Sequence, residues 1–336
     1  MLRETIDRSR GPLVTVITPV YNGAEYLAEC IDSVVTQRYQ NWVYIIVNNC
    51  STDKSLAIAT QYAVRDPRVI IHNSSTCRRA VDNWNYALTL MPRESKYCKI
   101  VHADDWLFPE CLAKMVELAE AHRTISVVTS YRLIGSSVGN VGLPYSSSVI
   151  PGKDIARRFL RSELNLFGNP SAVLFRADCV RERREFYADT PEIRVGQDCQ
   201  SCLDVLQNGD FGFVHQVLSF SREHEGSLTA MVLKLGTEYP EMLHLLKRYG
   251  PVFLTESEYR QCWKDAAAEY LQFLGRSVFL SRVPDFWSYH KEQLKRLGIS
   301  FNRVTLAASA LRGLVSTVKR SSRYIFRSGL QSPTKA

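Results

Sequence analysis

The sequence predicts an α/β fold, a Rossmann-like sandwich with a mostly parallel sheet, followed by a C-terminal helical region. Up to about residue 229, short runs rich in β-branched residues alternate with segments whose apolar residues recur at helical spacing. Strands that alternate with helices in this way form parallel sheets with right-handed crossovers. Beyond residue 230 the alternation stops and only helical patterns remain, so we place a domain boundary there.

The composition is that of a globular protein. The 336 residues are 45% hydrophobic and 23% charged, and the length is sufficient for a full core. The nine cysteines lack framework spacing, and the N-terminus lacks the apolar region of a secretory signal, so we expect a cytoplasmic protein. No run approaches the roughly 18 to 20 apolar residues that a membrane-spanning helix needs. We therefore expect any membrane contact to be peripheral.

A charged leader, residues 1–12, precedes the first strand. The predicted strands of the first half cover residues 13–19, 42–47, 69–71 and 97–101, and the helices between them cover residues 24–37, 54–64 and 83–90. The turn after the first strand contains only one glycine, Gly23, instead of the three of a dinucleotide-binding fingerprint. A dinucleotide-binding fold is therefore not indicated.

The fourth strand ends in an acidic turn, His102-Ala103-Asp104-Asp105, and a helix over residues 110–122 follows. Open α/β sheets bind their ligands at the carboxyl ends of strands, and carboxylate oxygens suit Mg²⁺ or Mn²⁺ bound to a diphosphate. Either Asp could instead cap the following helix. Two adjacent carboxylates repel each other unless a cation or a donor lies between them, so a purely structural role for both is less favoured.

The pattern after this turn is less regular. The predicted strands cover residues 125–134, 172–175 and 211–219, and the predicted helices cover residues 154–162, 196–206, 238–249, 256–274 and 303–327. Residues 135–151, rich in Gly and Ser, predict a flexible loop over the site. The α/β domain is thus expected to span residues 13–229 and the helical region residues 230–336.

Six sequence blocks are informative together. They cover residues 16–22, 47–55, 83–88, 103–105, 196–198 and 222–227. In this order and spacing they resemble family 2 glycosyltransferases of the GT-A fold, over roughly residues 13–229. The resemblance implies transfer of a sugar from a nucleotide diphosphate donor to an acceptor hydroxyl, with inversion at the anomeric carbon.

The resemblance implies nucleotide-binding roles for Pro19, Tyr21 and Asn49. Tyr21, after the first strand, would offer a flat surface to the base, although ordinary packing is the alternative. The family commonly has an acid where Asn49 stands. Because an amide both donates and accepts, the base preference is open, and the neighbouring Asn48 is an alternative contact.

The remaining donor contacts are charged. Arg79 matches a base- or phosphate-contacting position, with Arg78 and a solvated basic face as alternatives. In the acidic turn, His102 stands where the family often has its first Asp. The resemblance assigns Asp105 to the metal, Mn²⁺ or Mg²⁺, and Asp104 to the ribose or the metal. His102 is a further candidate ligand, although a hydrogen-bonded structural histidine is the alternative.

Inversion also requires a base that takes the acceptor proton. Asp198 matches the family's base position, with Gln197 in place of the acid that often precedes it. An Asp at a helix N-terminus would be expected to have a depressed pKa, which would weaken it as a base. His224 resembles a residue that in some relatives reaches the metal or diphosphate, which makes it another candidate ligand.

The C-terminal tail is basic. Residues 303–327 contain six Arg and Lys residues and no acid, and the apolar residues of 304–318 share one helical face. Such a helix could lie on an anionic membrane surface, where lipid-linked sugar acceptors are found, or dock on the catalytic domain. Nucleic acid is not expected, because no recognition motif accompanies the charge.

The sequence therefore predicts a metal-dependent inverting glycosyltransferase that uses a nucleotide sugar, with UDP sugars favoured. The expected acceptor is a saccharide or a lipid-linked sugar, in cell-surface polysaccharide or glycolipid synthesis at the cytoplasmic membrane face. A non-catalytic sugar-nucleotide-binding protein stays open, because His102, Asn49 and Gln197 stand where acids are common. A nucleotidyltransferase is less favoured, because its Gly-rich phosphate loop is missing.

Overall fold

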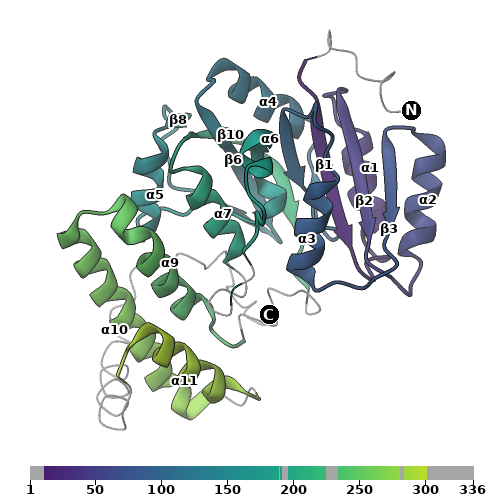
Figure 1. Ribbon diagram of the computed structural model, residues 1–336. Helices are drawn as coiled ribbons and strands as arrows, with labels where there is room; N and C mark the ends of the chain where they lie inside the picture. The colour runs from purple at the N-terminus through teal and green to yellow at the C-terminus, as the bar shows by residue number, and fades with distance from the viewer. Residues whose placement is uncertain (1–10, 189, 191–195, 225–233, 281–283, 301–336) are drawn as a thin grey trace, which may run out of the picture.

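A computed structural model describes residues 11–300 except 189, 191–195, 225–233 and 281–283 (Figure 1). The strands are β1 Val14–Val20, β2 Trp42–Asn48, β3 Val69–Asn73, β4 Tyr97–Ile100, β5 Trp106–Leu107, β6 Ile125–Ile134, β7 Ser137–Gly139, β8 Val149–Ile150, β9 Leu174–Arg176 and β10 Asp210–Ser221. The helices are α1 Leu27–Val35, α2 Ser55–Arg65, α3 Ala80–Thr89, α4 Cys111–Ala121, α5 Gly152–Leu160, α6 Ala177–Arg181, α7 Gln197–Val205, α9 Glu238–Phe253, α10 Glu256–Leu280 and α11 Phe286–Leu297, with a short 3-10 turn, η3, at Pro170–Ala172.

The described strands form one sheet in the order β3-β2-β1-β4-β9-β6-β10-β5, with β7 paired to β6 and β8 paired to β10. Pairs β1–β2, β1–β4, β2–β3 and β6–β10 are parallel. Strand β9 runs antiparallel to both β4 and β6, so β4 and β6 point the same way. The carboxyl ends of β1, β2, β4, β6 and β10 therefore meet at one edge, and the mostly parallel α/β sheet predicted from the sequence is confirmed.

Alternating side chains of the central strands enter two separate cores. Val14, Val16 and Val20 of β1 pack with the buried residues of α1, α2 and α4 on one face of the sheet. Ile17 points to the other face, where it joins a core built from α3, α5, α7 and α9. Because both faces are covered, β1, β2 and β4 are buried along their whole length, as is typical of parallel strands.

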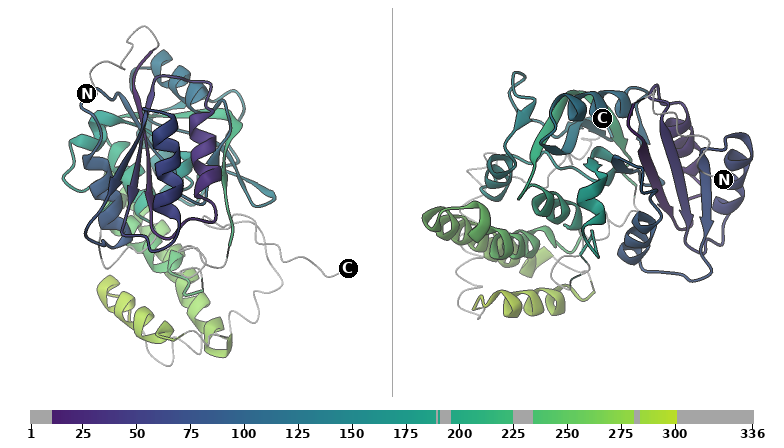
Figure 2. Two further views of the ribbon diagram at one scale, coloured as in Figure 1. Left: turned by 90° about the vertical axis from the view of Figure 1, so that its right-hand side faces the viewer. Right: turned by 45° about the horizontal axis from the view of Figure 1, so that its top comes forward.

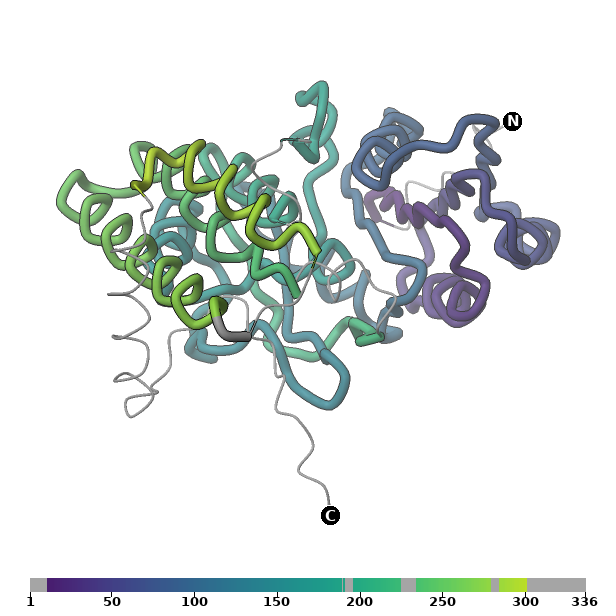
Figure 3. Tube along the Cα trace, turned by 90° about the horizontal axis from the view of Figure 1, so that it is seen from below, coloured from purple at the N-terminus to yellow at the C-terminus, as the bar shows by residue number. Residues whose placement is uncertain are grey.

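The C-terminal helices are joined to this sandwich through α9 (Figures 2 and 3). One side of α9, including Leu245 and Tyr249, belongs to the core over the sheet. Its Leu243 belongs to a third core with α10 and α11. The helix after the predicted boundary near residue 230 is therefore part of the packing of the α/β unit.

The segment after β6 differs from its prediction. Residues 135–151 were expected to be a flexible loop, but they contain β7 and β8. Leu133 of β6 pairs with Val138 of β7, and Phe211 of β10 pairs with Ile150 of β8, so the short strands obtain backbone partners from neighbouring long ones. The predicted leader, except residues 11 and 12, and the basic tail at 303–327 lie outside the described residues.

No helix within the described part of the chain has both the length and the apolar character needed to cross a membrane.

Candidate active site

Two loops at the carboxyl edge of the sheet are fastened to each other. The Asn22 side-chain oxygen accepts the Thr52 backbone N–H at 2.8 Å, and the Asn22 N–H donates to Ser51 Oγ at 3.0 Å. Asn22 adopts a left-handed conformation with φ 50°, which Asn tolerates better than most residues. Its neighbour Tyr21 is 57% exposed, so the loop presents an aromatic surface to solvent.

Asn49 is committed to the backbone of the next loop. Its Nδ2 donates to the Arg78 carbonyl and its Oδ1 accepts the Arg78 N–H, both at 2.8 Å, and the side chain is buried. The guanidinium of Arg78 packs 3.9 Å above the Tyr86 ring, whereas Arg79 is exposed and pairs with Asp82. Pro19 lies buried in β1, in register with Val47. Of the two arginines, Arg79 is thus the one exposed beside this loop.

The acidic turn brings three ligand-type side chains together. Within the described residues, ligand atoms of His102, Asp104 and Asp105 lie within 4.8 Å of one another. A hydrogen bond from the Asp105 N–H to the His102 carbonyl, 3.0 Å long, closes the turn. Burial, followed by the charge of Asp104, raises the pKa of Asp105. A bound cation would relieve this repulsion.

The two acids have different surroundings. Asp105 is 4% exposed, and its two oxygens accept the Arg222 backbone N–H at 3.0 Å and Asn169 Nδ2 at 2.8 Å. Asp104 is half-buried, and one of its oxygens lies 3.0 Å from His224 Nε2. Asp104 therefore faces the open side of the turn, together with His224, while Asp105 faces the protein.

One ring nitrogen of His102 has no hydrogen-bond partner among the described residues. Its backbone N–H donates to Ser171 Oγ at 3.0 Å, and its ring packs on Trp84 with centroids 5.2 Å apart. Nε2 is buried and has no hydrogen-bond partner among the described residues. The alternative of a structural histidine held by ring hydrogen bonds therefore finds no support at Nε2, and the nitrogen is available to a ligand.

Asp198 is the second residue of α7, one position inside the helix, and Gly196 occupies the N-cap position. Its Oδ1 is buried without a partner in the part of the chain described. Burial raises the pKa of Asp198 to about 7, although the nearby charges of His102 and Arg132 lower it. The depressed pKa expected for a helix N-terminus is therefore wrong, because desolvation outweighs the helix dipole here. Gln197 beside it is buried.

Sequence reasoning assigned no role to the residues that brace the acidic turn. Asn169 and Ser171 approach it from the η3 segment and Arg222 from the end of β10. Arg132 of β6 donates to Ser221 Oγ at 3.1 Å, and burial lowers the pKa of its guanidinium while the charges of Asp105 and Asp198 raise it. An arginine inside an apolar strand is the one signal in the sequence that could have indicated such a role.

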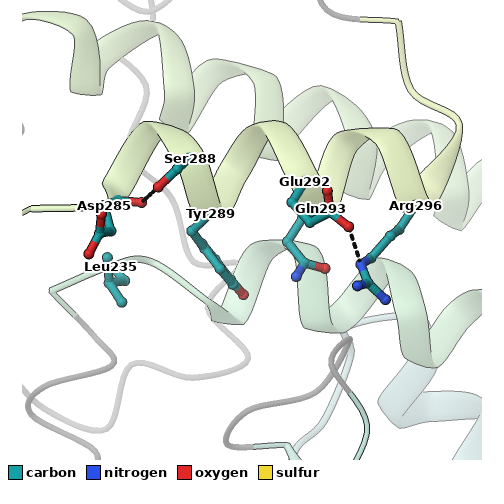
Figure 4. Close-up of a pocket in the computed structure, with 7 residues that line it drawn as sticks. All are labelled: Leu235, Asp285, Ser288, Tyr289, Glu292, Gln293 and Arg296. Carbon is teal, nitrogen blue, oxygen red and sulfur yellow. Dashed lines mark hydrogen bonds and ion pairs between the residues drawn. The ribbon is translucent and has the colours of Figure 1, made fainter.

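A separate pocket lies among the C-terminal helices, along α11 (Figure 4). Its lining residues are Leu235, Asp285, Ser288, Tyr289, Glu292, Gln293 and Arg296. None of the predicted site residues belongs to this pocket, so the sheet edge remains the candidate site.

The sandwich with an acidic turn at the carboxyl edge of its sheet defines a GT-A-type α/β protein. The sequence profile of glycosyl transferase family 2 matches residues 15–184, just over half of the chain. The chain therefore belongs to glycosyltransferase family 2, as its sequence blocks predicted.

Individual relatives agree with this membership. EpsE of Bacillus subtilis, which is named as a glycosyltransferase without proof of activity, is 35% identical over 140 residues, which cover 41% of this chain and 50% of EpsE. An uncharacterized glycosyltransferase of Haemophilus influenzae is 28% identical over 178 residues, which cover 52% of this chain and 54% of that protein. The chain thus spans about half the length of these curated relatives.

Solved structures share the fold. TarS residues 1–349 from S. aureus give a TM-score of 0.60 at 14% identity, covering 90% of this chain and 88% of that one. The mannosyltransferase PcManGT from Pyrobaculum calidifontis gives a TM-score of 0.51 at 15% identity, covering 90% and 86%. At such low identity the likeness establishes the architecture alone.

Proposed function

We propose that this protein is an inverting glycosyltransferase that moves a sugar from a nucleotide diphosphate, a UDP sugar, to an acceptor hydroxyl. The observation that carries the proposal is the pairing of the acidic turn with Asp198. Burial lowers the pKa of the Arg132 guanidinium and the charges of Asp105 and Asp198 raise it, so both carboxylates are within electrostatic reach of one buried cation. Leaving-group and base chemistry are thereby available in one site.

The donor would bind at the loops after β1 and β2. Tyr21 would supply an exposed ring for the nucleotide base. Arg79 would supply an exposed cation, and it lies next to Arg78, whose backbone is held by Asn49. Because both polar groups of Asn49 bind the Arg78 backbone, Asn49 would support the base site by shaping it. Related folds bind such donors: TarS has been crystallised with UDP-GlcNAc and with UDP, and PcManGT with GDP-Man and Mn²⁺.

The acidic turn suits a divalent metal. His102 Nε2 is buried without a partner among the described residues, and two adjacent carboxylates repel each other in the absence of a cation. We assign Asp104 as the principal ligand, with His102 and His224 as neighbouring candidates. Asp105 would hold the turn, because both of its oxygens already accept hydrogen bonds from protein donors. This order differs from the sequence expectation, in which Asp105 was the metal ligand. The metal would supply charge neutralisation of the diphosphate.

Asp198 would act as the base. The acceptor oxygen attacks the anomeric carbon, the bond from that carbon to the diphosphate oxygen breaks, and the acceptor proton passes to the Asp198 carboxylate. A carboxylate with a pKa of about 7 binds that proton far better than an ordinary Asp does. Attack on the side opposite the leaving diphosphate gives inversion.

The acceptor would be a saccharide or a lipid-linked sugar at the cytoplasmic membrane face, in cell-surface polysaccharide or glycolipid synthesis. The net charge of +8 and the basic residues of 303–327 support attraction to anionic lipids. Deleting residues 303–336 should release the protein from anionic vesicles while donor hydrolysis persists. Unchanged vesicle binding would contradict the membrane role.

A donor panel tests the proposal. Purified protein with Mn²⁺ should hydrolyse or transfer from at least one of the UDP, TDP and GDP sugars, and a UDP sugar should be the fastest. No turnover with any donor would contradict the proposal. Tight, metal-independent nucleotide binding without turnover would instead favour a non-catalytic binding protein, and pyrophosphate release from a nucleoside triphosphate would favour a nucleotidyltransferase.

A further inference from the structure

Arg222 contacts the acidic turn at two points. Its backbone N–H donates to Asp105 Oδ1 at 3.0 Å, and its side-chain Nε donates to the Asp104 carbonyl at 3.1 Å. These bonds fix the backbone between the two acids from the side of β10. The orientation of both carboxylates therefore depends on where Arg222 lies.

Helix α1 holds the Arg222 side chain in place. The Arg222 guanidinium forms an ion pair with Glu29 of α1. It also lies 4.3 Å above the ring of Tyr26, the residue just before α1 begins. The Arg222 side chain is 23% exposed and that of Glu29 is 55% exposed. A planar guanidinium makes a hydrogen bond at its edge and a stacking contact on its face at the same time, which an ammonium cannot do.

The same helix reaches the other end of the turn. Cys30 Sγ lies 3.3 Å from the His102 carbonyl, and Ser33 Oγ accepts the N–H of Leu107, two residues after Asp105, at 3.1 Å. Helix α1 thus contacts the chain directly at His102, before the two acids, and at Leu107, after them. At the acids themselves the contact is made by Arg222, which α1 holds in place.

The charge of Arg222 is already balanced. Glu29 neutralises the Arg222 guanidinium, and Arg222 Nε donates to the backbone carbonyl of Asp104. The polar contacts of the Arg222 side chain are therefore with protein groups. Residues that hydrogen-bond the groups around a metal site orient the metal ligands, and their loss commonly weakens metal binding. Arg222 is placed to act in this way on the acidic turn.

We propose that Arg222 is a positioning residue that holds the acidic turn in its cation-binding geometry, and that Glu29 on α1 orients Arg222 for this task. The inference rests on the proposed metal site at Asp104. Loss of the Arg222 side chain frees the Asp104 carbonyl and loosens the turn, whereas loss of the Glu29 charge weakens only the support of Arg222.

Direct Mn²⁺ titration of the purified full chain tests this, with free Mn²⁺ followed by its electron paramagnetic resonance signal. Arg222→Ala should raise the Kd for Mn²⁺ by about tenfold or more. Arg222→Lys should recover only part of the loss, and Glu29→Gln should raise the Kd by about two- to fivefold, in keeping with a partly exposed ion pair. The double variant should bind no more weakly than Arg222→Ala, because Glu29 acts through Arg222.

The matched control is Glu292→Gln. It removes another ion pair between partly exposed side chains, that of Arg296 with Glu292 within the C-terminal helix α11, and it should leave the Kd unchanged. If wild type binds Mn²⁺ and both Arg222→Ala and Glu29→Gln bind it equally well while remaining folded by circular dichroism, the positioning role is wrong and the proposed function is untouched. If wild type transfers sugar but binds no Mn²⁺, both the metal assignment and this inference fail.

Discussion

At the residue scale, the pKa of Asp198 determines when the proposed base can work. Burial places this pKa at about 7, so the carboxyl is largely protonated below pH 7 and ionised above it. A base must be ionised before it accepts the acceptor proton, so kcat/KM should rise about tenfold per pH unit below pH 6.5 and level off above about pH 8. A pH–rate profile of transfer measures this. A profile flat between pH 5 and 8 would exclude Asp198 as the titrating base.

The Asp198→Asn variant separates this role from binding. An amide of the same shape cannot take the proton, so transfer should fall by about 10²-fold or more while nucleotide affinity is retained. Calorimetry with the donor's nucleotide diphosphate provides the control. Transfer close to the wild-type rate would show that the base lies elsewhere.

The two acids of the turn should respond differently to substitution. Asp104→Asn should abolish metal-dependent donor binding with little change in Tm, because Asp104 is half-buried on the open side. Asp105→Asn should lower the free energy of unfolding by about 1 to 3 kcal/mol, because the new amide N–H₂ would face the Arg222 or Asn169 donor. Metal titration and thermal melts of both variants check this. The reverse pattern would restore Asp105 as the principal ligand.

At the element scale, the site is assembled from loops that bind each other. Asn49, directly after β2, holds the segment before α3 through both polar groups of its side chain. Asn22, after β1, is similarly tied to Thr52. The loops proposed to bind the donor are therefore positioned by contacts between the ends of neighbouring parallel strands.

Asn49→Ala tests this arrangement. It leaves the N–H and carbonyl of Arg78 without their partner, so the free energy of unfolding should fall by about 1 to 3 kcal/mol and the KM for the donor should rise. Thermal melts and donor kinetics measure the two effects. Asn208→Ala, at an exposed Asn near the end of α7, is the matched control. A normal Tm in Asn49→Ala would mean that the Arg78 bonds contribute nothing.

At the scale of the whole molecule, α9 makes the C-terminal helices part of the fold. Its residues in the core over the sheet are Met242, Leu245, Leu246, Tyr249 and Phe253. Burying an apolar side chain of this size stabilises by about 1.5 to 3 kcal/mol, so this face contributes roughly 8 to 15 kcal/mol. That is comparable to the entire net stability of a typical domain, which is about 5 to 15 kcal/mol.

A chain ending at residue 229 should therefore fail to fold. A chain ending at residue 300 retains α9 to α11 and should fold. Expression of both truncations, with circular dichroism and size-exclusion chromatography, checks the expectation. A soluble, cooperatively melting 1–229 fragment would show that the α/β unit is independent of α9.

The regular elements of the α/β unit followed from the sequence because their signals are local. The runs at β1, β2 and β6 are β-branched and apolar, and the helices between strands have clear 3.6-residue periodicity, so each could be read without its neighbours. Strands β7 and β8 have only three and two residues, and they exist because β6 and β10 supply backbone partners. No local pattern could predict them.

What the sequence alone determined was the family and the sheet, and it predicted the candidate site residues, because the acidic turn, Asp198 and His224 are chemical groups at recognisable positions. Tertiary structure decided the surroundings on which their proposed roles depend, because these surroundings come from distant partners. Asp105 accepts a hydrogen bond from the backbone of Arg222, which lies 117 positions later in the chain. Only the folded chain brings these two residues together. The pKa of Asp198 is raised, against the helix dipole, because burial is a property of the packed molecule and desolvation outweighs the dipole.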